Sequence, residues 1–156
     1  MKPKVYLETT IPSLLAAWPN RDVVILGQQQ ATRDWWDQHR HKYELFISDL
    51  VAVECRRGDA IAAREREELL APCSLLNIPE AAQQLAQRIL AAGLMPARAT
   101  ADALHVAIAA VHKMDFLLTW NCRHIANAAT VERVRGVCSQ AGYQPPVICT
   151  PFELMV

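Results

Sequence analysis

The chain has 156 residues, the length of one ordinary domain, and its hydrophobic content of 52% is enough for a full core, which excludes intrinsic disorder. Lysine plus arginine and aspartate plus glutamate number 16 each, so the formal net charge is zero. A general attraction to nucleic acid is therefore excluded, and polyanion binding must come from a local patch. We expect one domain over residues 1–156.

The N-terminus and the cysteines indicate where the protein works. The sequence MKPKVYLETT has a short apolar stretch that Glu8 interrupts, which predicts neither a signal peptide nor a membrane span. The five cysteines are an odd number, and no pair has the C-x-x-C spacing. This pattern favours reduced thiols in a cytoplasmic protein over disulfides or a zinc site.

Short apolar runs alternate with helical patterns along the chain. In chain order they predict a strand at 5–7, a helix over 23–43, a strand at 45–47, helices over 49–57 and 61–70, a strand at 75–78, helices over 79–92 and 101–113, a strand at 116–119, a helix over 126–140 and a strand at 147–149. Ser48 or Asp49 is expected to cap the second helix, and Thr100 the helix from 101. Strands that are apolar throughout are typical of a parallel sheet buried on both faces. The predicted fold class is α/β, a single-domain three-layer sandwich with a central parallel sheet.

Four polar residues occupy positions where such folds bind ligands. Glu8 directly follows the first strand, and Asn121 lies just past the fourth. Glu54 lies in the helix after the second strand, and Asp102 lies in the first turn of its own helix. Because parallel sheets bind ligands outside the carboxyl ends of their strands, we expect the four to converge there. Asp115 precedes its strand, so we place it at the opposite end.

Three of these four side chains are carboxylates. Each close pair of anions costs about 1 kcal/mol in water and more where solvent is scarce, so such a cluster favours a bound cation. Hard oxygen ligands suit Mg²⁺ or Mn²⁺. Structural interpretations remain open for each residue: a helix-dipole contact for Asp102, a solvated helix face for Glu54, the sheet rim for Glu8 and a turn for Asn121.

Several neighbouring residues are candidates for supporting roles. Thr9 and Thr119 flank the acids and are expected to hydrogen-bond them or a bound water. Arg56, Arg57 and Arg123 are either phosphate contacts or salt-bridge partners of nearby acids.

The histidines and tryptophans are assigned structural roles. His105 is interpreted as a hydrogen-bonded residue at a helix surface, and His124 has no second ligand pair for zinc. Trp35 and Trp36 have helical spacing and are expected in the core or at a subunit contact.

The chain resembles the PIN domain, the nuclease fold of VapC-type toxins in toxin–antitoxin pairs. Four segments carry the resemblance, which covers nearly the whole chain: VYLETT, SDLVAVECRRG, ADALHVAIAA and DFLLTWN. The resemblance implies an Mg²⁺- or Mn²⁺-dependent endoribonuclease with Glu8, Glu54, Asp102 and Asn121 as catalytic and metal-binding residues. It also implies an RNA substrate, a small antitoxin partner and a homodimer, with no membrane association.

Two positions depart from the family pattern. Glu8 stands where the family usually has aspartate, and Asn121 stands where aspartate is common. The cluster keeps three carboxylates, so we expect one tightly held ion at most. Two alternatives stay open: a PIN-like module that has lost catalysis and binds RNA or protein, and a different metal-dependent α/β phosphohydrolase. With only five glycines and no glycine-rich loop, a P-loop or Rossmann nucleotide site is not supported.

Overall fold

One parallel sheet forms the centre of the molecule in the computed structural model, which describes residues 1–156. Its strand order is β3-β2-β1-β4-β5, and every neighbouring pair is parallel. The strands are β1 (Lys4–Leu7), β2 (Glu44–Ser48), β3 (Ser74–Leu76), β4 (Phe116–Leu118) and β5 (Val147–Cys149). The predicted α/β sandwich with a parallel sheet is confirmed.

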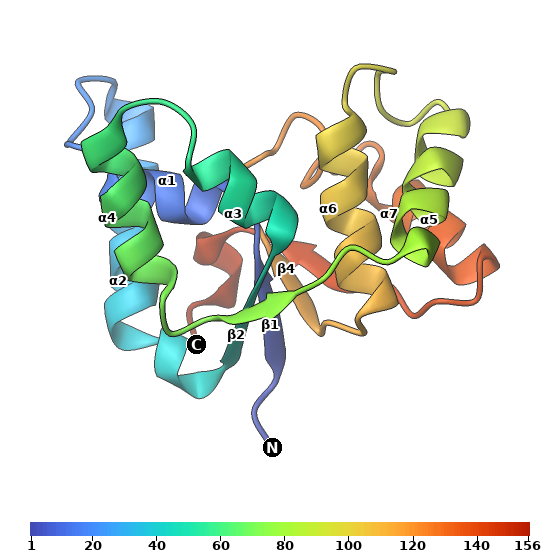
Figure 1. Ribbon diagram of the computed structural model, residues 1–156, viewed down its shortest axis with the longest axis horizontal. Coiled ribbons are helices and arrows are strands. Elements are labelled where there is room, and N and C mark those ends of the chain that lie inside the picture. Colours follow the sequence, from blue (N-terminus) through green and yellow to red (C-terminus); the bar gives the residue numbers. More distant parts are fainter.

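Seven α-helices cover the sheet in two groups (Figure 1). The first group comprises α1 (Thr10–Ala16), α2 (Val23–Gln38), α3 (Asp49–Cys55) and α4 (Ala60–Leu70), and the second α5 (Glu80–Ala91), α6 (Thr100–Val111) and α7 (Val131–Gln140). Two short 3₁₀ turns, η1 (Arg40–Lys42) and η2 (Pro151–Leu154), complete the chain. Right-handed crossovers place the two groups on opposite faces, because the chain moves outward from β1 to β3 and then returns to β4.

The strand order reverses between β1 and β4, and this reversal positions the candidate site. Connections leave β1 and β4 toward opposite sides of the sheet, which opens a crevice at the carboxyl ends of these two strands. The pairing of Leu7 with Leu118 brings these two ends level. Glu8 and Thr119, the next residue of each strand, therefore lie side by side.

The core is built on both faces of β1. Val5, Tyr6 and Leu7 are fully buried, as expected for a central strand of a parallel sheet. Trp35 is fully buried and Trp36 nearly so, which confirms their predicted place in the core. No helix of the structure combines the length and apolar character needed to cross a membrane.

The helix boundaries differ from the predictions in three places. The helix predicted over 23–43 ends at Gln38 and gives way to η1, because the chain must turn into β2. The helix predicted over 126–140 begins only at Val131, since the side chain of Asn127 accepts the Ala129 N–H and holds a turn before it. The helix α1 was not predicted, because seven residues that include Pro12 give too short a periodic pattern.

One of the two predicted helix caps is confirmed and the other is wrong. Ser48 caps α3 by accepting the Val51 N–H, one of the two predicted options. Thr100 is wrong as the cap of α6, because it is the first helical residue and its side chain makes no capping hydrogen bond. The helix instead begins after Ala99, whose carbonyl accepts the Ala103 N–H.

Candidate active site at the carboxyl end of the sheet

Glu8 lies in a cage of threonine hydroxyls directly after β1. Its Oε1 accepts hydrogen bonds from Thr119 Oγ1 and Thr10 Oγ1, each at 2.7 Å, and its Oε2 accepts the Thr10 backbone N–H at 3.0 Å. The residue is only 4% exposed. Three donors replace the water that burial removes, so the cage holds this carboxylate in one orientation.

Glu54, near the C-terminus of α3, is held by one of its two oxygens. Oε1 accepts hydrogen bonds from Thr9 Oγ1 and His105 Nε2, both at 2.7 Å, while Oε2 has no hydrogen-bond partner. Burial acts to raise the pKa of Glu54, but the hydrogen bonds from His105 and Thr9 and the nearby positive charge of Arg57 outweigh it and leave the pKa below its ordinary value. This carboxyl group is therefore ionised at neutral pH.

Asp102 pairs with a histidine that follows β4. Its Oδ2 lies 2.8 Å from His124 Nδ1, and its Oδ1 has no hydrogen-bond partner. The Oδ1 of Asn121 accepts the backbone N–H of His124 at 3.0 Å, and the Asn121 N–H donates to Thr119. Asn121 therefore shapes the turn that brings His124 to Asp102, and its side-chain oxygen is already engaged.

The acids belong to one connected region rather than to separate surfaces. Thr9, adjacent to Glu8, donates to Glu54, and His105 reaches Glu54 from one helical turn beyond Asp102. No lysine or arginine forms a salt bridge with any of the three carboxylates. The carboxylates of this edge are therefore hydrogen-bonded by hydroxyl, backbone and histidine groups, and Arg57 acts on Glu54 through its charge without a salt bridge.

The residues suit a divalent cation by chemistry, but the structure does not assemble a complete ligand set. No three histidine, cysteine, aspartate or glutamate side chains lie close enough together to hold one ion. The free carboxylate oxygens are Glu54 Oε2 and Asp102 Oδ1, and hard oxygens of this kind are what Mg²⁺ and Mn²⁺ prefer.

Both predicted threonines contact the acids. Thr9 binds Glu54 and Thr119 binds Glu8, as the sequence indicated. Arg56 forms a salt bridge with Glu67 at 3.2 Å, which is the structural alternative for this arginine.

The interpretation of His105 as a helix-surface residue was wrong. His105 is 1% exposed and not a helix-surface residue, because α6 is apolar on nearly every side and its residues 105–110 are all buried. The apolar run VAIAAV after His105 was the available signal. Tyr6 hydrogen-bonds to His105, and Ser48 hydrogen-bonds to Tyr6. Both residues were missed from the sequence, because a tyrosine in a strand and a serine at a helix cap are ordinary.

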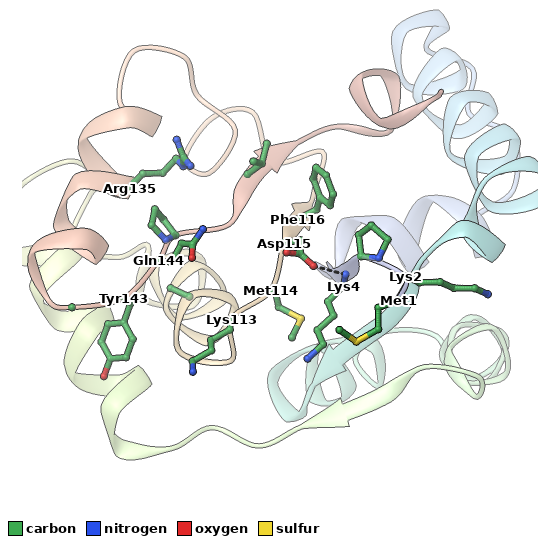
Figure 2. Close-up of a pocket in the computed structure, with 15 residues that line it drawn as sticks. Met1, Lys2, Lys4, Lys113, Met114, Asp115, Phe116, Arg135, Tyr143 and Gln144 are labelled. Atoms are coloured by element: carbon green, nitrogen blue, oxygen red, sulfur yellow. Dashed lines mark hydrogen bonds between the residues drawn. The ribbon is translucent and has the colours of Figure 1, made fainter.

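The opposite edge of the sheet has a different character. A cavity of about 830 Å³ lies at the amino-terminal ends of β1 and β4, and Lys2, Lys4, Lys113 and Asp115 are among its lining residues (Figure 2). There Asp115 accepts the backbone N–H of Lys4 at 2.7 Å. The predicted placement of Asp115 away from the other acids is thus confirmed.

Together these features define an α/β protein with an acidic site at the switch point of a parallel sheet. A family model for the PIN domain matches residues 24–129, which include Glu54, Asp102 and Asn121. The chain belongs to the PIN domain family, whose members are generally nucleases.

One solved structure shares the fold across almost the whole chain. It is the crystal structure of VapBC2 from Rickettsia felis bound to a DNA fragment from their promoter. The match has a TM-score of 0.60 at 11% sequence identity and covers 94% of this chain and 97% of the other. No curated protein gave a significant match to the sequence.

Proposed function

We propose that this protein is a divalent-metal-dependent endoribonuclease that hydrolyses RNA phosphodiesters at the carboxyl edge of its sheet. The observation that supports the proposal most strongly is that Thr9 and His105 link the segments that carry Glu8, Glu54 and Asp102, while none of the three carboxylates forms a salt bridge with a lysine or arginine. Membership of a family of nucleases supports the same conclusion.

The hydrogen bonds of the site side chains suggest a separate role for each of them. Asp102 would hold Mg²⁺ or Mn²⁺ through its free Oδ1, and Glu8 through the remaining lone pair of its Oε2, in each case directly or through water. Glu54 would orient the attacking water through its free Oε2. When bound, the ion supplies Lewis-acid polarisation of a phosphoryl oxygen and a more acidic bound water. Thr10 and Thr119 keep Glu8 in place, and Asn121 positions the turn that carries His124.

Cleavage of a labelled RNA with and without Mn²⁺ tests this proposal. We expect Asp102→Asn to lose cleavage, because one charge of the ion site is removed while the side-chain shape is kept. Asp115→Asn is the matched control: the change is identical, but it lies at the opposite edge, where the amide oxygen still accepts the Lys4 N–H. Equal rates for wild type and Asp102→Asn would remove Asp102 from the site.

The chemistry of the product ends separates this mechanism from a histidine-driven one. Water attack leaves a free 2′-hydroxyl and no cyclic phosphate, whereas attack by the neighbouring 2′-hydroxyl gives a 2′,3′-cyclic phosphate. We expect linear ends, and a substrate with 2′-deoxy residues at the cut site should still be cleaved. Cyclic phosphate formed without Mn²⁺ would instead implicate His124, the more exposed of the two histidines.

The alternative is a PIN-like module that binds RNA or protein without cleaving it. Two observations favour this alternative: the Asn121 side-chain oxygen already accepts the His124 N–H, and the set of metal ligands is incomplete. It predicts no Mn²⁺-dependent cleavage by purified wild-type protein, together with RNA binding that weakens as salt rises.

We also propose two protein partners: a small antitoxin that covers the acidic edge, and a second copy of this chain. The structural likeness to a VapBC2 complex supports the antitoxin. Four exposed apolar side chains just before and at the start of α2 support the second copy: Trp18, Val23, Val24 and Leu26. Light scattering should give a dimer for wild type and a monomer for Val24→Lys. A monomeric wild-type protein would contradict the homodimer.

A further inference from the structure

A chain of buried hydrogen bonds runs through the interior behind Glu54. Ser48 Oγ and Tyr6 Oη are 2.8 Å apart, Tyr6 Oη and His105 Nδ1 are 2.7 Å apart, and His105 Nε2 lies 2.7 Å from Glu54 Oε1. Ser48 and Tyr6 are fully buried, and His105 is 1% exposed. None of these three residues belongs to the acidic set, and together they form a polar line through an apolar core.

The line connects the two ends of α3. Ser48, the last residue of β2, caps the start of α3, and Glu54 lies near the end of α3, so the connection passes from this cap through β1 and α6 to Glu54. In Figure 1, α3 lies at the upper end of β1, and α6 stands to the right of both. Because α6 also carries Asp102, the same bonds fix the distance between the two helices that supply these acids.

Only one direction of donation satisfies every member of the line. The Val51 N–H donates to Ser48 Oγ at 3.3 Å, which leaves the Ser48 hydroxyl hydrogen free for Tyr6. Tyr6 then donates to His105 Nδ1, and His105 donates through Nε2 to the carboxylate. In the reverse direction the Ser48 hydroxyl hydrogen has no acceptor, which is costly in a dry interior.

The geometry points to His105 as a positioning residue for Glu54, held as the Nε2–H tautomer by the relay from Ser48 through Tyr6. His105 and Thr9 both bind Oε1, so the relay keeps Oε2 as the free oxygen of Glu54. Groups that orient a catalytic carboxylate in this way typically contribute about 10- to 100-fold to metal affinity or activity. The catalytic part of the inference rests on the proposed function, and the tautomer part does not.

The tautomer is measured without RNA or metal. Long-range ¹H–¹⁵N correlation spectra of ¹⁵N-labelled full-length protein should show His105 with a protonated Nε2 and an unprotonated Nδ1. In Tyr6→Phe the donor to Nδ1 is lost, and we expect the His105 signals to shift or broaden. Tyr43→Phe is the matched control, because the Tyr43 hydroxyl makes no hydrogen bond and lies outside the relay. A protonated Nδ1 in the wild type, or a spectrum that Tyr6→Phe leaves unchanged, would overturn the relay.

Cleavage kinetics with Mn²⁺ measure the consequence for Glu54. We expect Tyr6→Phe to lower kcat about tenfold with KM for RNA unchanged, while Tyr43→Phe changes neither. His105→Gln keeps one acceptor and one donor on its amide and should retain more kcat than His105→Leu, which keeps neither. Equal kcat in these two histidine variants, with both folded, would refute the positioning role. The predicted tautomer in a wild type that cleaves nothing would instead refute the proposed nuclease.

Discussion

Replacing Thr119 by valine tests the threonine cage around Glu8. Thr119 is fully buried, and its hydroxyl donates to Glu8 Oε1 at 2.7 Å. The same oxygen accepts the Asn121 N–H at 2.9 Å. Valine has nearly the same shape, so the substitution removes these two hydrogen bonds and leaves the packing in place.

The size of the effect follows from the charge of the acceptor. A hydrogen bond to a charged group contributes about 1.5–3 kcal/mol, and the bond from the Asn121 N–H contributes about 0.5–1.5 kcal/mol. Burial of a methyl group in place of the hydroxyl offsets roughly 0.8 kcal/mol of that loss. We therefore expect Thr119→Val to lower the free energy of unfolding by about 1–4 kcal/mol. For a domain of this size, that corresponds to a Tm lower by roughly 2–16 °C.

Urea and thermal unfolding followed by circular dichroism measure this difference. The control is Thr130→Val, because the Thr130 side chain makes no capping hydrogen bond at the start of α7. The control should unfold within about 0.5 kcal/mol of wild type, as is usual for substitutions away from buried networks. If Thr119→Val matched Thr130→Val in stability, the cage around Glu8 would not be what stabilises the buried carboxylate.

Three further predictions concern pH, backbone conformation and thiol reactivity. Because the folded pKa of Glu54 lies below its ordinary value of 4.5, its stabilising contribution is full above that pH and is lost as the pH falls through the folded pKa. In urea titrations, the difference in free energy of unfolding between wild type and Glu54→Gln should therefore shrink below about pH 4.5. A difference that stays constant down to about pH 3 would contradict the lowered pKa. Gly93 has φ +73° after α5, so Gly93→Ala should lower the free energy of unfolding by about 1–2 kcal/mol. Gly136 lies inside α7, so Gly136→Ala should raise the free energy of unfolding by roughly 0.5–1 kcal/mol. The opposite order of stability in urea would refute the assigned conformations. The exposed Cys122 should react first with a thiol reagent in native protein, and all five cysteines should react after denaturation; fewer than five would reveal a disulfide.

The positions of Glu8 and Asp115 were predictable because they depend on the sheet alone. A residue directly after a parallel strand must lie at its carboxyl edge, so Glu8 could be placed from the apolar run that precedes it. Asp115 could be placed at the other edge by the same reasoning. The side-chain roles of these acids stay predictions.

Contacts between distant buried polar groups were not predictable from local patterns. Tyr6 and His105 are 99 residues apart, and neither position carries a periodic signal for the other. His124 was set aside as a zinc ligand, and nothing in its neighbourhood indicated that a turn shaped by Asn121 would bring it to Asp102. Such pairings depend on how α6 packs on β1 and β4, which is a property of the whole fold.

Anomalous diffraction from a crystal grown with saturating Mn²⁺ tests the shared ion site most directly. The account predicts one strong peak at the carboxyl edge of the sheet, coordinated by Asp102 and by Glu8 or Glu54, directly or through water. A map with no peak there, in which Asp102 still contacts only His124 and Glu54 still contacts only Thr9 and His105, would contradict it.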